Sequence, residues 1–384
     1  MVSLRGIALG FACLTTTCRA PTNAEPTRAP VVLIEATAPS ARASPPDPGG
    51  TDAAAPAPSP EDPWATASWA HRPLAWHPVA PAPSSFRAPR WTAHASGTTE
   101  VLGVVFGTSA DDVWIGGEQG TVLRTRDRGK TFRSFTLEGD EPVLSIWGAG
   151  PEDVWVLGQH AVHRVLHGDT LATLSVKLEG EGYGGAGHVR GTSAADVWLA
   201  TGALVHTVDG GATWSSTHGC SRVLGCMPGR DGAADLWTSS PLDVWAAGFW
   251  FFVTHSVDGG KTWEHATYTP GMEEDFHLRG SGPGDVWIVG FHLGPTHSLD
   301  GGATWQEERP PNPSGPSWTP PFYNDFWSSG GGWAWAATNF GVWVRPGKTP
   351  WVRMLDTGDI AALWASGPGD LWAVGKAGRV LHAP

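Results

Sequence analysis

The strongest constraint on the fold is a sequence element that recurs seven times. From residue 101 onward, a short apolar run and a turn rich in Gly, Ser and Pro precede Asp-Val-Trp or a close variant. The copies end on Trp114, Trp155, Trp198, Trp245, Trp287, Trp335 and Trp372, and successive copies lie 37 to 48 residues apart. A period in this range, with short strands in each repeat, is typical of a β-propeller. We therefore predict an all-β fold, a seven-bladed β-propeller with four-stranded blades.

A second motif follows the Asp-Val-Trp element in four of the repeats. It reads S/T-x-D-x-G-x-T-W/F, and its central carboxylates are Asp127, Asp209, Asp258 and Asp300. The glycines permit a positive φ in a tight hairpin, and each Asp can accept hydrogen bonds from the turn backbone. The terminal aromatic ring can pack between sheets. We therefore interpret these four carboxylates as structural.

This second motif resembles the Asp box, also called the BNR repeat, of sialidases and related propellers. Single seven-bladed propellers of this kind resemble the photosystem II assembly-factor family and the ectodomains of sortilin-like receptors. The chain also resembles surface propellers of Gram-negative bacteria that follow a signal and a Pro/Ala-rich linker. These resemblances imply an exported, non-catalytic module that binds a protein, peptide or glycan, or acts as a scaffold.

The ends of the propeller region indicate how the ring closes. The last repeat stops after its third strand, at residues 379–384. The stretch Arg90–Ala95 resembles the strand that follows the second motif in other repeats. We predict that this stretch supplies the missing outer strand of the last blade, because an open sheet edge would invite aggregation.

Two segments precede the propeller of residues 90–384. Residues 1–20 combine Arg5 with a short apolar run and small residues, which predicts an export signal. The alternative is a chance apolar patch, and both lipidation at Cys13 or Cys18 and plain secretion fit the signal. Residues 21–89 are rich in Ala, Pro, Ser and Thr, so we expect a disordered linker. The predicted location is the periplasm, the outer membrane surface or the extracellular space.

The cysteines of the predicted mature chain are Cys220 and Cys226. Two cysteines this close in an exported protein favour one local disulfide. A second Cys or His pair at metal-ligand spacing is missing from the sequence, so we predict no metal centre built on them and no cofactor.

The net charge of the chain is −12. Binding to nucleic acid depends on Lys and Arg that neutralise phosphates, so an acidic chain argues against a nucleic-acid partner. The same charge argues against docking on an anionic membrane surface. After the first twenty residues, no apolar run is long enough to span a bilayer. We expect a monomer.

The expected binding face consists of the second-to-third-strand loops and the blade-to-blade connections, opposite the Asp-Val-Trp turns. It is acidic and aromatic, which suits a sugar, a cationic peptide or a divalent ion. The alternative is a set of solvated loops that keep the surface soluble. The candidate binding residues are Trp250, Phe251, Tyr268, Glu273, Glu274, Asp275, His292, Tyr323 and Asp325.

The alternative function is a glycoside hydrolase, because propellers with Asp boxes include sialidases and other glycosidases. A sialidase needs an Arg cluster and has six blades, whereas the inner strands here supply only Arg190 and Arg279. Other glycosidases need two carboxylates about 5 to 10 Å apart. The candidates for such a pair are Asp325 with Glu273, Glu274 or Asp275. We predict binding rather than catalysis.

Overall fold

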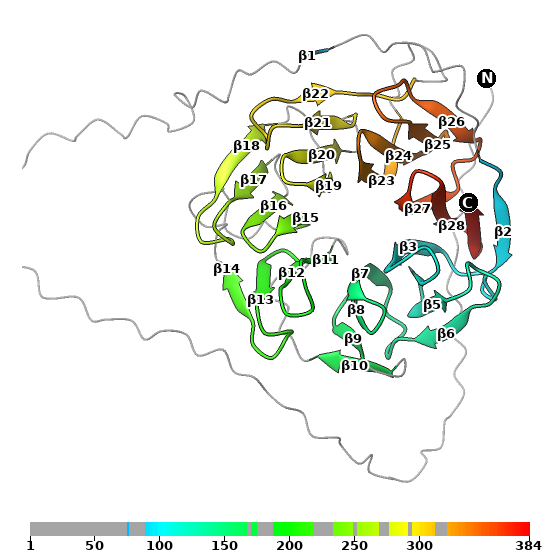
Figure 1. Cartoon of the computed structure of the whole chain (residues 1–384). Helices are drawn as coiled ribbons and strands as arrows, with labels where there is room; N and C mark the ends of the chain where they lie inside the picture. The colour runs from blue at the N-terminus through cyan, green and yellow to red at the C-terminus, as the bar shows by residue number, and fades with distance from the viewer. Residues whose placement is uncertain are drawn as a thin grey trace, which may run out of the picture. The chain divides into compact units, whose positions relative to one another are not determined.

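The computed structural model describes residues 75–76, 89–166, 170–174, 187–217, 233–248, 252–268, 276–290, 294–311 and 321–384. Their regular structure is β-strand, arranged as seven four-stranded antiparallel sheets around one axis, with one short strand added to the fifth sheet (Figure 1). The predicted seven-bladed propeller with four-stranded blades is confirmed. Within this part of the chain, no helix is long and apolar enough to cross a membrane.

The two inner strands of each blade form the wall of the ring. The first strands of blades 1 to 7 are β3 (Leu102–Gly107), β7 (Val143–Gly150), β11 (His188–Gly191), β15 (Ala233–Ser240), β19 (Phe276–Gly282), β23 (Tyr323–Gly330) and β27 (Ile360–Gly367). The second strands are β4 (Val113–Gly117), β8 (Asp153–Gly158), β12 (Val197–Ala200), β16 (Asp243–Gly248), β20 (Asp285–Gly290), β24 (Trp333–Thr338) and β28 (Asp370–Gly375).

The two remaining strands complete each blade toward the rim. The third strands are β5 (Thr121–Thr125), β9 (Val162–Leu166), β13 (Leu204–Thr207), β17 (Phe252–Ser256), β21 (Thr296–Ser298), β25 (Gly341–Arg345) and β29 (Arg379–Ala383). The outer strands are β6 (Arg133–Thr136), β10 (Thr170–Leu174), β14 (Ser215–Thr217), β18 (Glu264–Tyr268), β22 (Gln306–Glu307), β26 (Val352–Leu355) and, for blade 7, β2 (Thr92–Ala95).

The tryptophan of each Asp-Val-Trp element is the main contact between neighbouring blades. All seven of these indoles are at most 1% exposed: Trp114, Trp155, Trp198, Trp245, Trp287, Trp335 and Trp372. In blade 4, the ring of Trp245 stacks on His255 at 4.0 Å between centroids and meets Trp305 of blade 5 edge-on at 6.1 Å. Burying rings of this size contributes strongly to stability. Each blade is therefore held by its neighbours, as in other repeat folds.

Six of the seven tryptophans follow an aspartate that faces a His or Arg of the third strand; blade 6 has Trp333 at this position. In blade 4, Asp243 accepts a hydrogen bond from Ser239, and its Oδ1 lies 2.5 Å from His255 Nε2. In blade 1, Arg124 takes the place of the histidine and holds Asp112 through Nε at 2.7 Å. A catalytic relay would place the histidine between serine and aspartate. Here the aspartate is the central group, so the arrangement fastens a hairpin.

Closure of the ring follows the prediction. Strand β2 pairs antiparallel with β29, from Thr92 opposite His382 to Ala95 opposite Arg379 (Figure 1). The indole Nε1 of Trp91 also donates to the carbonyl of Met354 in blade 6 at 3.2 Å. The N-terminal stretch therefore completes blade 7, as predicted.

Deleting residues 1–99 should accordingly lower the melting temperature by about 10 °C, because loss of a whole strand costs several kcal/mol. Deleting residues 1–85 leaves β2 in place, and its melting temperature should match that of the full chain within about 2 °C. Differential scanning calorimetry of the two shortened chains checks this. Equal melting temperatures for both would contradict a stabilising role for β2.

Part of the segment before the propeller also joins a sheet. Strand β1 (Ala75–Trp76) pairs in parallel with β22 of blade 5. The other residues of 1–88 lie outside the described part of the chain, and the export signal, the lipidation and the linker stay predictions.

Candidate functional site

Side chains of the inner strands surround a cavity of about 90 Å³ on the axis of the ring. Strands β3 and β27 contribute mainly apolar residues to its wall, including Val104, Val105 and Ala362. The opposite side of the wall is polar and comes from blades 2, 3, 5 and 6. Its polar side chains are Ser145, His188, Arg190, His277, Arg279, Asn324 and Asp325.

An alternation between blades produces the polar side. Blades 3 and 5 carry His-x-Arg on their inner strands, as His188-Val-Arg190 and His277-Leu-Arg279. Residues two apart on a strand point to the same face, so each pair lies together. Blades 2, 4 and 6 carry Ser145, Asp235 and Asp325 at the position equivalent to the histidine. The two histidines, Ser145 and the two aspartates lie in the first half of their strands, on the side of the blade-to-blade connections, and each arginine lies two residues further along.

Arg279 is paired with two carboxylates. Its Nη1 lies 2.8 Å from Asp235 Oδ2, and its Nη2 lies 3.1 Å from Asp325 Oδ1. Asp235 also accepts the backbone N–H of Leu278 at 3.0 Å and that of Leu236 at 2.7 Å. Burial of Asp235 opposes its ionisation, but His188 and Arg279 outweigh burial and lower the pKa of Asp235 to about 2. Asp235 therefore joins blade 4 to blade 5 as a fixed anion.

Asp325 joins blade 6 to blade 7 in the same way. Its Oδ1 accepts the N–H of Phe326 at 2.8 Å, and its Oδ2 accepts the N–H of Leu363 at 2.8 Å. With Arg279 on Oδ1, both oxygens of Asp325 are engaged. The two channel aspartates thus act as inter-blade acceptors.

Arg190 differs from Arg279 in its partners. Its Nη1 donates to Ser145 Oγ at 3.1 Å and to the carbonyl of Val189 at 2.7 Å. Within the described residues, no ion pair joins Arg190 to a carboxylate. Burial, followed by repulsion from Arg279, lowers the pKa of Arg190 to about 10. Arg190 is still a cation at neutral pH, and both of its acceptors are uncharged.

The two predicted site residues that the structure fully describes are not in a blade-to-blade connection. Tyr323 and Asp325 lie on β23, so their predicted position was wrong. Tyr323 is 4% exposed and packs beside Phe326 and Trp343, and burial raises the pKa of its hydroxyl. The sequence Tyr-Asn-Asp-Phe-Trp continues the blade repeat, because its Trp327 aligns with Trp147 and Trp237. It therefore forms an inner strand.

Most other predicted site residues lie outside the part of the chain that the structure describes. Tyr268 is the last residue of β18. The remaining ones lie outside the described residues: Trp250, Phe251, Glu273, Glu274, Asp275 and His292, together with Cys220 and Cys226 of the predicted disulfide.

The four carboxylates of the second motif organise their own hairpins. Asp258 accepts the N–H of Thr262 at 2.9 Å, the hydroxyl of Thr262 at 2.6 Å and the hydroxyl of Ser256 at 2.8 Å. Asp127, Asp209 and Asp300 make the same three contacts. These bonds engage the carboxylates within the turn.

The same bonds predict acid resistance of the hairpins. Hydrogen bonds from the threonine side chain and backbone lower the pKa of Asp127, Asp209 and Asp258 to about 2. A folded-state pKa below the unfolded value contributes stability above pH 4 that is lost as pH falls toward 2. Carbon-detected NMR titration of these carboxyls should give midpoints near 2. Midpoints near 4 would contradict the bonding pattern.

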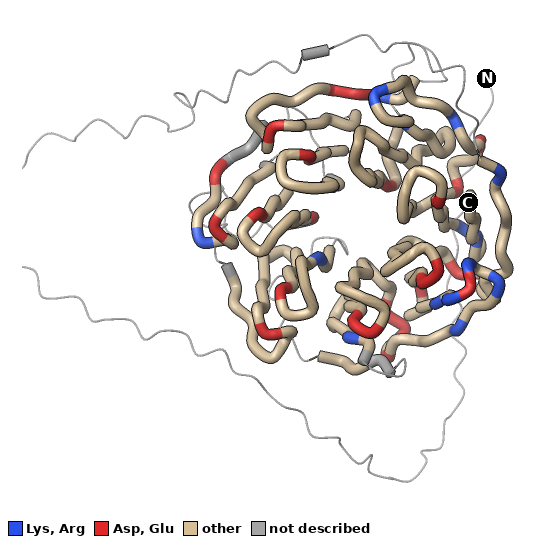
Figure 2. Tube along the Cα trace, in the orientation of Figure 1, with Lys and Arg blue, Asp and Glu red and all other residues tan. Residues whose placement is uncertain are grey.

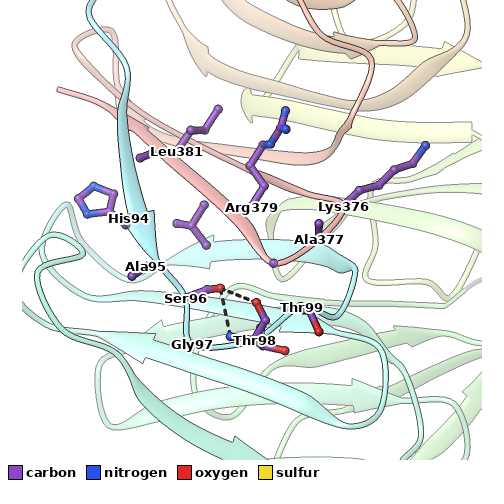
Figure 3. Close-up of a pocket in the computed structure, with 13 residues that line it drawn as sticks. His94, Ala95, Ser96, Gly97, Thr98, Thr99, Lys376, Ala377, Arg379 and Leu381 are labelled. Carbon is purple, nitrogen blue, oxygen red and sulfur yellow. Dashed lines mark hydrogen bonds between the residues drawn. The ribbon is translucent and has the colours of Figure 1, made fainter.

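A second surface depression lies at the closure seam, and none of its lining residues belongs to the histidine–arginine cluster. It measures about 700 Å³ and is lined by residues 93–99 and 376–381. Ser96 and Thr98 bond to each other there, and Lys376 and Arg379 point away from them (Figure 3). His94 stacks on Trp372 with centroids 5.7 Å apart. The depression lacks polar groups that converge on one point, so it is a weaker candidate than the channel.

Charge elsewhere is dispersed or paired. Asp and Glu are spread over the turns, while Lys and Arg gather beside β2, β5 and β6 (Figure 2). Two of these cations are engaged, Arg126 with Glu152 at 3.0 Å and Arg128 with Asp370 at 2.9 Å. Among the described residues, no group of three His, Cys, Asp or Glu side chains could hold a metal ion.

Comparison with known proteins identifies the class of fold. A solved structure of YCF48 bound to D1 peptide is similar to this chain with a TM-score of 0.60 and 17% identity, covering 79% of this chain and 98% of that one. YCF48 from Cyanidioschyzon merolae gives the same score and identity over 76% of this chain and 98% of its own. Virginiamycin B lyase from Staphylococcus aureus matches with a TM-score of 0.59 and 10% identity, over 76% and 98%.

At these identities the similarity shows the fold alone, so the protein is a seven-bladed propeller. No family model matches the sequence, and no curated protein matches it.

Proposed function

We propose that the chain is a non-catalytic binding module that holds a protein or peptide partner where the axial channel opens toward the blade-to-blade connections. The observation that carries this proposal is the polar cluster of His188, Arg190, His277 and Arg279 on one wall of the axial cavity. Arg279 is held by Asp235 and Asp325, whereas Arg190 on the same rigid ring offers oriented donors to a partner that inserts a polar group.

The engagement of the channel carboxylates favours binding over glycoside hydrolysis. A hydrolase needs one carboxylic acid whose pKa is raised, so that it can donate a proton near neutral pH. Asp235 has a pKa lowered to about 2, and both oxygens of Asp325 already accept hydrogen bonds. Neither group has the properties of a general acid.

The similar structures are consistent with a binding role, but they do not distinguish binding from catalysis. YCF48 was solved with a bound peptide, and a lyase shares the same fold. A propeller fold is therefore compatible with both binding proteins and enzymes, so the function has to be inferred from the residues of the site. The Asp-box resemblance and the predicted export signal extend the proposal to a module exported to the periplasm, the outer membrane surface or the medium.

This function is tested by selecting, from a peptide library, the peptides that bind to the full chain, and by measuring their affinities. Gly103 lines the cavity, and a Cβ there meets nothing within 4 Å. Gly103→Phe should therefore fill the channel without strain and weaken the selected peptides by about tenfold or more. Gly282→Phe is the matched control, because a Cβ at Gly282 also meets nothing within 4 Å, at the other end of an inner strand.

Equal affinities of the two variants and the unaltered chain would contradict binding at the channel. Assays with a panel of chromogenic glycosides test the alternative function, glycoside hydrolysis. Hydrolysis that is lost in Asp325→Asn would replace the binding proposal with the hydrolase alternative.

A further inference from the structure

The same arginine site occurs twice in the ring, once between blades 4 and 5 and once between blades 2 and 3. The two copies differ in the side chain that accepts the hydrogen bond from the arginine. Asp235 in blade 4 accepts the N–H of Leu278 and Nη1 of Arg279 in blade 5. Ser145 in blade 2 accepts the N–H of Val189 at 3.2 Å and Nη1 of Arg190 in blade 3. The geometry is shared, but the second copy has a hydroxyl where the first has a carboxylate.

The second copy also lacks the other carboxylate. Nη2 of Arg279 reaches Asp325 of the next blade at 3.1 Å. The equivalent aspartate for Arg190 is Asp235, whose oxygens accept Leu236, Leu278 and Arg279. None of the described residues accepts a hydrogen bond from Nε or Nη2 of Arg190. One edge of this guanidinium is therefore open.

We propose that Arg190 is the anchor for a carboxylate group of the bound ligand, in the axial cavity. This inference deepens the proposed function and rests on it, because the partner would deliver the carboxylate to the channel. Arg124 shows what the open edge can do within this same protein. Its Nε and Nη2 hold the two oxygens of Asp112 at 2.7 and 2.9 Å.

The size of the cavity restricts the group that enters. A volume of about 90 Å³ equals about three water molecules at the density of the liquid. A carboxylate fits this space, and the rest of the ligand would lie outside it. A planar carboxylate also matches the two parallel N–H groups of an arginine edge, which gives a short, charge-assisted pair of hydrogen bonds.

Electrostatics give the same preference for an anion. Arg190 is half-buried, and its hydrogen-bond acceptors are Ser145 and a carbonyl. Attraction from Asp235 and Asp325 only partly offsets the effects of burial and of Arg279 on its pKa, which leaves an unfavourable state for a cation. Arg279, by contrast, is neutralised by two aspartates. Burial lowers the pKa of His188 to about 3, so His188 is uncharged at neutral pH and does not compete for the anion.

The test is a titration of the full chain with sodium acetate at constant ionic strength, followed by the ¹⁵Nε signal of Arg190 in NMR spectra. The signal is assigned by its absence in Arg190→Lys. A saturable shift is expected with acetate. Sodium chloride over the same range should produce a shift at least about tenfold weaker, because chloride cannot form the paired bonds.

Two substitutions at one position distinguish an anchor from a structural arginine. Ser145→Asp reproduces the blade 4 arrangement and should occupy Arg190 internally, which weakens acetate about tenfold or more. Ser145→Ala leaves the open edge free, and acetate should bind as in the unaltered chain. Circular dichroism confirms that both variants are folded.

Blocked alanine peptides then identify the source of the carboxylate. One peptide has a free C-terminus, a second has a single Asp and an amidated end, and the third is amidated without an acid. Tighter binding of the first or second identifies a terminal or a side-chain carboxylate, and the third should not bind.

Absence of a saturable acetate shift in the unaltered chain overturns the anchor, whatever the variants do. Equal binding by Ser145→Asp and Ser145→Ala also overturns it. The titration needs no partner, so its failure would not contradict the proposed function, which the peptide selection tests separately. Conversely, acetate binding with no selected peptides would overturn the proposed function and keep the anion site.

Discussion

Replacing Trp245 with alanine is expected to lower the free energy of unfolding by about 3 to 5 kcal/mol. The indole is fully buried between blades 4 and 5. Its removal takes the stacking partner from His255 and the edge contact from Trp305. It also opens a cavity beside Leu278 and Ile288, which share its cluster. Strands on both sides fix these neighbours, so the space cannot collapse easily.

Urea denaturation measures this loss, with Val257→Ala as control. The side chain of Val257 is 70% exposed in the hairpin of the same blade, so its truncation should change stability by less than about 0.5 kcal/mol. A loss of less than about 1 kcal/mol for Trp245→Ala would mean that the blades do not depend on this ring. An altered slope of the transition would indicate that blades unfold separately.

Sequence periodicity was sufficient for the fold because the repeats share the same physical requirements. The tryptophan of the Asp-Val-Trp element is buried in all seven blades, and six of the seven repeats have the aspartate before it that must be bonded. The strand at Thr92–Ala95 was also predictable, because the last repeat stops one strand short. The partner of each Asp-Val-Trp aspartate was missed, although it has a signal: a His or Arg lies 10 to 12 residues later, as in Asp196 with His206 and Asp243 with His255.

The site was less predictable from the sequence because it depends on residues that differ from one repeat to the next at the same position. The two channel arginines were visible in the sequence, but their partners depend on which blade precedes each one. Ser145 and Asp235 occupy the same repeat position, and only their placement beside Arg190 and Arg279 shows that one arginine lacks a carboxylate. Asp325 was assigned to a loop because the repeat is degenerate in blade 6.

The last prediction concerns the glycine on which a tryptophan rests. Gly260 in the blade 4 hairpin has a φ of +82°, and a Cβ added there would lie 2.5 Å from Cη2 of Trp198 in blade 3. Gly211 and Gly302 meet Trp155 and Trp245 in the same way. The hairpin motif predicts a glycine with positive φ, whereas the close approach to the neighbouring ring is evident only in the structure.

Gly260→Ala should therefore carry two separate costs. An L side chain in the left-handed region costs about 1 to 2 kcal/mol, and overpacking a fixed ring costs about 1 to 3 kcal/mol more. Trp198 cannot move away easily, because it is fully buried and stacks on His206 at 3.7 Å. Gly97→Ala isolates the first cost, since Gly97 has a φ of +80° and a Cβ there meets nothing within 4 Å. Urea denaturation should show Gly260→Ala to be the more damaging change, and equal losses would mean that the indole shifts freely and the blade interface is less rigid than its packing indicates.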